Sequence, residues 1–402
     1  MIKDEDYRAL VAISNDMIND NTMKTHRYLY DMIDWSARLI CIRGAKGTGK
    51  TTMLLQYINE HYEDRQKVLY ISLDDFHFQL FSVYDVAEYA YTHGVEALFI
   101  DEVHYQKHWS QYIKNIYDRF KTLKVVYTGS SMLQLAKAEA DLSRRQSVYD
   151  LWGFSFREYL LFNHKLQMDA INLQTLLKEH ISISNEVRQS IKPLELFDEY
   201  LFKGYYPFCL EGTKDYHKRL ISVVDLTIFQ DIPLVEDISF NTLQKARKLL
   251  MILAQQVPFE PNISTLCRDI EATRDIVVKL LNLLEKAGLL MLLQKEKNNY
   301  KTLSKPDKIY LSNTNLMYAL TRTINKGTMR ETFFYNQVKN TQSVIMPPKG
   351  DFLIDGTYTF EVGGETKDFS QIKDIQDSYL AIDNTEYGIG NRIPLWLFGF
   401  LY

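Results

Sequence analysis

One stretch decides the fold, and it reads Arg38-Leu39-Ile40-Cys41-Ile42-Arg43-Gly44-Ala45-Lys46-Gly47-Thr48-Gly49-Lys50-Thr51-Thr52. Its first half is a short apolar run of the kind that forms a buried strand. Its second half fits G-x-x-x-x-G-K-[ST] from Gly44 to Thr51, and helix-forming sequence follows from Lys50 to about His61. The backbone N–H groups of such a loop face phosphate oxygens at the positive end of the next helix. The sequence therefore predicts a phosphate-binding loop.

We expect the whole run from Gly44 to Thr52 to contact a bound nucleotide. Lys50 would place its charge beside the outer phosphates, and the Thr51 hydroxyl would bind Mg²⁺. The alternative is a glycine-rich turn that binds nothing. The strand before the loop and the helix after it favour the nucleotide site.

Two carboxylates follow another apolar run, Ala97-Leu98-Phe99-Ile100. A triphosphatase needs an acidic residue at the end of a neighbouring strand to hold its metal through water, and Asp101 is the candidate. Glu102 would orient and deprotonate the attacking water. The alternative is that both are exposed carboxylates at a strand end. The pair favours hydrolysis over nucleotide binding alone.

Small hydroxyl residues follow a further predicted strand in Thr128-Gly129-Ser130-Ser131. A hydroxyl at the carboxyl end of a strand beside the phosphate site would hydrogen-bond the terminal phosphate or the attacking water. We choose Ser130 over Thr128 and Ser131 for this role. An ordinary turn or helix cap is the alternative for each of them.

Arginines lie downstream at Arg144, Arg145 and Arg157. An arginine that reaches the terminal phosphate stabilises the charge that spreads over its oxygens in the transition state. We choose Arg145, and the alternative is a surface cation in a salt bridge.

The first part of the chain alternates strands with helix-length segments. Strands are predicted at residues 38–43, 67–73, 97–100 and 123–127, after helical sequence at residues 4–34. This alternation predicts an α/β fold, the parallel sheet of a P-loop NTPase with helices on both faces.

The rest of the chain changes character, and we divide the whole into five parts. They are a helical lead-in (1–35), a P-loop core (36–153), a helical lid (154–240), a winged helix (241–310) and a small α+β domain (325–402). The winged helix follows from helical patterns at 242–256, 263–270 and 274–287 and from a two-stranded wing at 289–303 with Asn298-Asn299 at its tip.

The predicted winged helix is basic, with 12 Lys and Arg against 7 Asp and Glu between residues 241 and 308. Such a module could place its helix 274–286 in a DNA major groove. Winged helices also serve as protein-contact modules or as ATPase lids. Both uses remain open.

The C-terminal part carries acidic residues in a suggestive order. Asp351 is followed by Glu361, and Glu331 lies on an upstream helical stretch, as in the Asp and Glu-x-Lys pattern of restriction endonucleases. Gly363 stands where that pattern has lysine, and Lys367 is four residues further on, too far to substitute without rearrangement. We therefore expect a degenerate binding scaffold rather than a nuclease. The apolar run 393–402 predicts a final buried strand or a docking edge.

The composition limits the classes of protein and the kinds of site that remain possible. The 402 residues carry 47 Lys and Arg against 51 Asp and Glu, so any nucleic-acid surface must be local. Three cysteines without a CxxC pair indicate neither a disulfide framework nor a cysteine zinc site. No apolar run approaches a membrane span and no secretory signal is evident, so we expect a soluble cytoplasmic protein.

At this point the sequence resembles the AAA-type P-loop ATPases of bacteria and archaea that carry an uncharacterised nuclease-like C-terminal domain. The matching stretches are 28–35, the phosphate loop, Asp101-Glu102-Val103-His104 with Trp109, residues 128–131 and Trp152-Gly153-Phe154-Ser155-Phe156-Arg157-Glu158-Tyr159-Leu160. The family usually has Leu-Ala-Gly-Arg where this chain has Leu142-Ser143-Arg144-Arg145. The resemblance implies ATP as the nucleotide.

Two functions remain as expectations. One is a Mg²⁺-dependent ATPase whose nucleotide state controls the later domains, acting on DNA through the winged helix. The other is a nucleotide-stabilised scaffold in signalling or defence, with little turnover, that binds a client protein or a second copy of itself.

Overall fold

The computed structural model describes residues 2–129, 142, 144–234, 236–256, 262–295 and 306–402. The chain divides into two compact units. Unit 1 consists of Met1–Trp152 and Gln230–Asp237, and unit 2 consists of Gly153–Phe229 and Ile238–Tyr402.

Unit 1 is built on a parallel sheet with the strand order β2-β3-β4-β1-β5. Its strands are β1 (Leu39–Arg43), β2 (Val68–Ser72), β3 (Ala97–Asp101), β4 (Lys124–Gly129) and β5 (Ser147–Asp150). The four predicted strands are confirmed and lie within about two residues of their expected bounds. β5 was not predicted, because it is a short, half-exposed edge strand without an apolar run.

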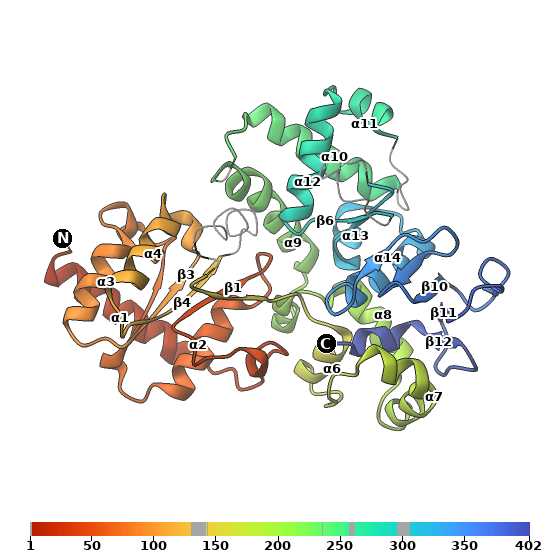
Figure 1. Cartoon of the computed structure of the whole chain (residues 1–402), viewed down its shortest axis with the longest axis horizontal. Helices are drawn as coiled ribbons and strands as arrows, with labels where there is room; N and C mark the ends of the chain where they lie inside the picture. The colour runs from red at the N-terminus through yellow and green to blue at the C-terminus, as the bar shows by residue number, and fades with distance from the viewer. Residues whose placement is uncertain (1, 130–141, 143, 235, 257–261, 296–305) are drawn as a thin grey trace. The chain divides into compact units, whose positions relative to one another are not determined.

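Helices cover both faces of this sheet (Figure 1). They are α1 (Asp4–Asp20), α2 (Lys50–His61), α3 (Val83–Thr92) and α4 (Trp109–Arg119). Alternate strand residues point to opposite faces. Leu98 therefore packs in the core with α3 and α4, whereas its neighbour Phe99 packs in the core with α2. The predicted P-loop NTPase fold, with helices on both faces of the sheet, is confirmed.

The predicted helix over residues 4–34 is wrong beyond Asp20. The chain leaves the helix at Asn21 and forms only a short 3₁₀ helix, η1 (Tyr30–Met32). α2 holds the intervening segment in place: the Gln56 amide donates to the carbonyl oxygens of Met23 and Thr25, at 3.0 Å each. These tertiary hydrogen bonds replace helical ones.

Unit 2 begins with helices and ends with a second sheet. Its helices are α6 (Phe156–Phe162), α7 (Leu173–Ser190), α8 (Pro193–Lys203), α9 (Tyr216–Leu226), α10 (Phe240–Gln256), α11 (Ile263–Asp269), α12 (Arg274–Lys286), α13 (Thr314–Leu320) and α14 (Lys326–Val338). The sheet has the order β12-β11-β10-β9-β8, made of β8 (Val344–Ile345), β9 (Phe352–Ile354), β10 (Tyr358–Gly363), β11 (Ser378–Ile382) and β12 (Arg392–Pro394). A helical region followed by a small α+β region is therefore present, as predicted.

Helices α10, α11 and α12 precede an antiparallel strand pair, β6 (Leu290–Leu293) and β7 (Lys308–Leu311). The three helices match their predicted positions closely. The second strand of the pair lies later than predicted, and the expected tip at Asn298-Asn299 lies outside the described residues.

The apolar C-terminal run 393–402 is buried, as predicted, but only its first two residues, in β12, belong to a strand. Leu395–Phe400 form a 3₁₀ helix, η8, in which every residue is buried. The Gly399 backbone passes so close to α6 that an added Cβ would lie 2.4 Å from the Cβ of Phe156. Close packing on helices rather than strand pairing therefore buries this end.

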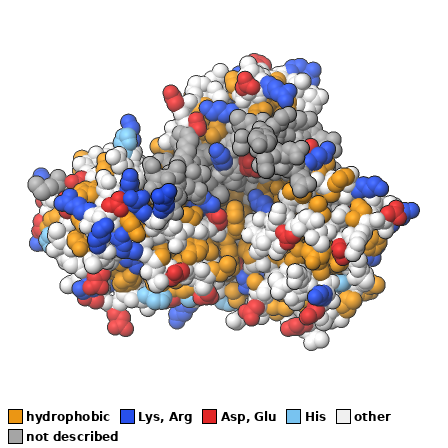
Figure 2. Space-filling model, in the orientation of Figure 1, with side chains coloured by type: hydrophobic (Ala, Val, Ile, Leu, Met, Phe, Trp, Pro, Cys, Tyr) orange, Lys and Arg blue, Asp and Glu red, His pale blue; other side chains and the backbone are white. Residues whose placement is uncertain are grey.

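Two surface properties bear on function. Lys and Arg side chains gather over α4 of unit 1, whereas charges of both signs are mixed over unit 2 (Figure 2). In the part of the chain that the structure describes, no helix has the length and apolar character that crossing a bilayer requires.

Candidate functional site

The phosphate loop joins the carboxyl end of β1 to the N-terminus of α2. Gly47 and Gly49 have φ angles of 85° and 92°, which side chains with a Cβ rarely adopt. An added Cβ at Gly44 would lie 2.3 Å from the carbonyl oxygen of Leu151. Glycine is thus required at these three positions by backbone conformation or by close approach. The loop has the curl that directs successive N–H groups inward.

Lys50 is the first residue of α2, and its side chain turns back over the loop. Its ammonium donates hydrogen bonds to the carbonyl oxygens of Gly44 at 3.0 Å and Ala45 at 3.1 Å. Burial lowers the pKa of Lys50, while nearby carboxylates oppose that shift. A nearly buried cation is therefore held inside the curl, where anionic oxygens would be attracted to it.

Arg27 fastens the outside of the loop, a role that the sequence did not reveal. Its guanidinium donates to the carbonyl oxygen of Thr48 and, at 2.7 Å, to that of Trp152. The Arg27 side chain is buried. It therefore ties the loop to the segment that follows β5.

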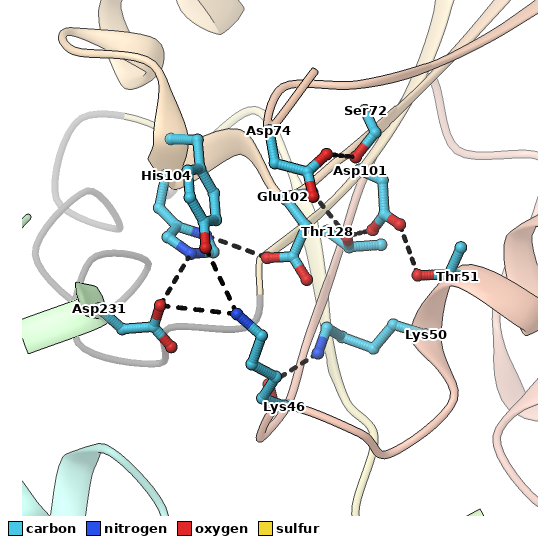
Figure 3. A network of polar contacts seen from close by, with 12 residues as sticks. Lys46, Lys50, Thr51, Ser72, Asp74, Asp101, Glu102, His104, Thr128 and Asp231 are labelled. Carbon is cyan, nitrogen blue, oxygen red and sulfur yellow. Dashed lines mark hydrogen bonds and ion pairs between the residues drawn. The ribbon is translucent and has the colours of Figure 1, made fainter. Parts of the chain in front are cut away.

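Asp101 ends β3 and accepts hydrogen bonds from three hydroxyl groups (Figure 3). They belong to Thr51, at 2.5 Å, to Tyr70, at 3.1 Å, and to Thr128. Burial and the neighbouring Glu102 raise the pKa of Asp101, and the Thr128 and Thr51 hydroxyls oppose that shift. The predicted magnesium ligands Thr51 and Asp101 thus lie in direct contact.

Glu102 follows the strand with a φ of 53°, in the left-handed region that residues with a Cβ seldom occupy. Its backbone N–H donates to the Thr128 hydroxyl at 3.2 Å. Its carboxylate Oε2 lies 3.4 Å from Nδ1 of the buried His104. This backbone turn aims the carboxylate away from Asp101, as a water-activating residue beside a metal ligand requires.

A third carboxylate, Asp231, joins this group from far along the sequence (Figure 3). Its Oδ1 lies 3.9 Å from Nζ of Lys46 and 3.9 Å from Nε2 of His104. Lys46 also donates to the Tyr105 hydroxyl at 3.3 Å. Nothing in the local sequence indicated Asp231, because only the tertiary fold brings it to the loop.

Of the two remaining predicted site residues, one lies outside the described residues and the other pairs with an aspartate of α4. Ser130 lies outside the described residues, as does its alternative Ser131. Arg145 forms a two-pronged ion pair with Asp118 of α4, with both N···O distances at 3.1 Å. The other hydroxyl that the sequence offered, Thr128, is the one that contacts Asp101.

This geometry agrees with the comparison with known protein families. Residues 36–160 match the family model of the AAA domain. The match contains the phosphate loop, Asp101, Glu102 and Thr128, whereas Asp231 lies beyond its end. Residues 194–327 match a second family model, described as a domain of unknown function (DUF8612).

Relatives extend over more of the chain than the AAA domain. The uncharacterized protein MJ1637 of Methanocaldococcus jannaschii is 28% identical over 286 residues, which make up 67% of this chain and 60% of that protein. The uncharacterized protein MJ1544 of the same organism is 23% identical over 350 residues, 82% of this chain and 73% of that protein. The chain therefore spans less than two thirds of the length of the first of these relatives.

Solved structures with an ATPase fold are also similar. The Walker-type ATPase PABY2304 of Pyrococcus abyssi has a TM-score of 0.37 and 12% identity, covering 79% of this chain and 95% of its own. AMPPCP-bound DnaA from Aquifex aeolicus has a TM-score of 0.28 and 17% identity, covering 71% and 90%. At these TM-scores the likeness carries no weight for function, which rests on the site in unit 1.

Unit 2 brings the predicted nuclease-like residues together, outside the AAA domain match. The ammonium of Lys308 lies 3.4 Å from Glu331 and 3.5 Å from Asp351. The Tyr310 hydroxyl donates to Glu331 at 2.6 Å. Burial and the nearby Asp351 raise the pKa of Glu331, while Lys308 opposes that shift. A lysine ammonium thus lies between the two carboxylates.

Lys367 reaches Glu361 although it lies four residues beyond Gly363. Its Nζ lies 2.5 Å from Oε1 of Glu361. Its side chain fills the space beside Gly363, where an added Cβ would lie 2.6 Å from the Lys367 Cβ. The absence of a side chain at Gly363 lets a lysine from later in the chain reach Glu361.

Within the described ranges, no group of three or more His, Cys, Asp or Glu residues is arranged to hold a metal ion.

Proposed function

We propose that unit 1 binds Mg-ATP and hydrolyses it to ADP and phosphate. The observation that carries this proposal is the joint placement of Lys50, Thr51, Asp101 and Glu102 around one glycine-bent loop. The match of residues 36–160 to the AAA domain supports a nucleotide as the ligand. ATP as the particular nucleotide rests on the family resemblance of the sequence.

Each residue has a distinct task in this proposal. The loop N–H groups and Lys50 bind and orient the phosphates, and the low-dielectric setting of Lys50 strengthens its attraction for them. Glu102 accepts a proton from the attacking water, and His104 beside it orients its carboxylate. Arg145 completes the site only if its pair with Asp118 opens.

The residues present fit a magnesium ion. In nucleotide sites Mg²⁺ keeps several waters and takes only one or two protein ligands besides substrate phosphates. Thr51 and Asp101, whose oxygen atoms lie 2.5 Å apart, are two such oxygen donors, and a larger cluster of ligands is not needed. Bound Mg²⁺ would neutralise charge on the transferred phosphoryl group.

Two modes of action follow from unit 2. In the first, nucleotide turnover changes how α10–α12 and the β6–β7 pair bind DNA, and the excess of basic residues in residues 241–308 supports this mode. In the second, unit 2 is a scaffold that binds a client protein or a second copy of the chain, and turnover is slow. Mixed surface charge over unit 2 supports the second mode.

Steady-state phosphate release by the full chain tests the proposal, measured with Mg-ATP in the presence and absence of duplex DNA. We expect Lys50→Ala to abolish nucleotide binding, because it removes the buried cation of the loop. Glu102→Gln should keep binding but lower phosphate release by about a hundredfold or more, the usual size of a lost general base.

The same assay separates the alternatives. Stimulation by DNA that disappears in Glu102→Gln supports action on DNA, and indifference to DNA supports the scaffold. Wild-type affinity for ATP in Lys50→Ala would remove the assignment of the loop.

A further inference from the structure

Asp231 is the last residue of η6 (Thr227–Asp231), a π-helical turn. Only 1% of this residue is exposed, and neither carboxylate oxygen has a hydrogen-bond partner among the residues that the structure describes. A buried carboxylate is costly unless it is paired and hydrogen-bonded. Asp231 is therefore an unusual group to find beside a phosphate loop.

The two nitrogen-bearing side chains that face Asp231 make no hydrogen bond with it. Lys46 of the loop and His104 each lie 3.9 Å from its Oδ1. At that separation the pair gains Coulomb attraction but lacks the directional bonds of a tight ion pair. Such a contact forms and breaks more readily than one with close donors.

The Asp231 carboxylate affects the pKa of Lys46. Burial alone would lower the pKa of Lys46, but Asp231, then Tyr105 and Glu102, outweigh that effect and raise it. Lys46 belongs to the phosphate loop, so phosphate oxygens bound by that loop would also attract its ammonium. Asp231 and an incoming polyphosphate are thus two anions beside one lysine, and they repel each other.

Asp231 also lies in a segment that connects the phosphate-loop unit to unit 2 along the backbone. It belongs to Gln230–Asp237, which packs as part of unit 1. On both sides this segment continues directly into unit 2, at Phe229 and at Ile238. Any shift of Asp231 is therefore passed along the backbone to both flanking stretches.

We propose that Asp231 is an internal competitor of the nucleotide: it holds Lys46 when the loop is empty and yields Lys46 to the phosphates when nucleotide binds, which loosens residues 230–237. This inference rests on the nucleotide-binding function proposed above. Linkage makes the coupling reciprocal, so whatever releases Asp231 tightens nucleotide binding by the same factor.

Two measurements on the full-length chain test this coupling. Equilibrium titration with a non-hydrolysable ATP analogue and Mg²⁺ gives the affinity, and hydrogen exchange reports the amides of residues 230–237 with and without the analogue. In the wild type we expect exchange of these amides to become about five- to tenfold faster when the analogue binds, the usual size of such coupling.

Asp231→Asn should bind the analogue about five- to tenfold more tightly than the wild type. Its segment should exchange fast even without nucleotide and should no longer respond to it. Asp237→Asn removes an exposed carboxylate from the same segment and is the matched control. It should behave as the wild type in both measurements. Lys46→Met should loosen the segment without altering Asp231, which shows that the pair holds the segment rather than the aspartate alone.

The outcomes separate the two proposals. A wild-type chain that binds no analogue would remove the proposed function and this inference with it. A wild-type chain that binds the analogue without any change in the exchange of residues 230–237 would overturn only the inference. Weaker binding of the analogue by Asp231→Asn would also overturn only the inference. It would show that Asp231 supports nucleotide binding instead of competing with the nucleotide.

Discussion

Thr128 shows how much a single hydroxyl can organise at this site. It donates to one oxygen of Asp101 and accepts from the backbone N–H of Glu102 at 3.2 Å. One buried side chain therefore holds the carboxylate of Asp101 and the backbone of Glu102, the two residues that the proposed reaction needs. A group that fixes two neighbours at once should affect turnover more than binding.

Thr128→Val keeps the shape of this side chain and removes the hydroxyl. We expect phosphate release to fall by at least about tenfold, which corresponds to about 1.4 kcal/mol of lost transition-state stabilisation. Nucleotide affinity measured without magnesium should change by less than about twofold, because the loop and Lys50 are untouched.

The matched control is Thr92→Val on α3, which removes an exposed hydroxyl that donates to the carbonyl oxygen of Tyr89 at 2.8 Å. It should leave phosphate release unchanged. Equal losses of affinity and turnover in Thr128→Val would contradict a positioning role.

At this scale the sequence revealed what is local. The loop, Asp101 and Glu102 were predictable because each is adjacent to an apolar strand. Thr128 lies within β4 and the two serines follow it, so the choice among these hydroxyls depended on where the strand ends; Thr128 is in contact with Asp101. Arg27 and Asp231 reach the loop from distant segments through backbone carbonyl or long ionic contacts, for which no spacing rule exists.

At the scale of elements, the beginning of β4 carries a half-buried lysine, Lys124. Lys124 donates to the carbonyl oxygen of Trp35 and, at 3.2 Å, to the Tyr57 hydroxyl. The rings of Trp35 and Tyr57 are stacked beside it at 3.8 Å. Burial lowers the pKa of Lys124 to about 8, and Asp34 opposes this only weakly.

This lowered pKa gives a pH dependence of stability. The unfolded lysine titrates at about 10.4, so between about pH 8 and pH 10.4 the unfolded chain binds more protons than the folded one. The contribution of Lys124 to the free energy of unfolding should therefore rise with pH, by about 1 to 2 kcal/mol from pH 7.5 to 9.5.

Urea unfolding of the wild type and of Lys124→Met at both pH values measures this difference. The variant should lack that part of the rise. An identical pH response in the two proteins would show that Lys124 has an ordinary pKa in the folded state.

Elements were predictable where apolar periodicity is strong and unpredictable where tertiary contacts decide. The strands β1 to β4 and the helices α10 to α12 lie close to their expected positions. The segment from Asn21 to Leu29 was assigned wrongly, because hydrogen bonds from α2 override the local pattern. The C-terminal run is a strand only at its start, because close packing in unit 2 accompanies a 3₁₀ helix at Leu395–Phe400. The edge strand β5 has too little buried surface to be recognised.

At the scale of the whole molecule, each unit has a core of its own. The two clusters on the faces of the first sheet belong to unit 1. In unit 2, Phe333 of α14 is 2% exposed and packs edge-on against Phe197, with ring centroids 4.7 Å apart. Cores that are built separately can melt separately.

Phe333→Ala tests this independence. The substitution should destabilise unit 2 by about 3 to 5 kcal/mol, since it leaves a cavity between aromatic rings. In differential scanning calorimetry we expect one transition to fall by roughly 10 °C. The transition that Mg-ATP raises should stay in place, because the proposed nucleotide site lies in unit 1. A single transition that responds to both changes would show that the units unfold together.

The return of Gln230–Asp237 to unit 1 has a consequence for inheritance by recombination. A gene segment that ends at Trp152 would carry all five strands of the first sheet and the glycine-bent loop, yet it would leave Asp231 behind. A protein made from that segment would keep the residues of the proposed nucleotide site. It would lack the Asp231 carboxylate, which we propose competes with the nucleotide for Lys46. Recombination between related genes therefore preserves the proposed coupling only when both segments of unit 1 are transferred together.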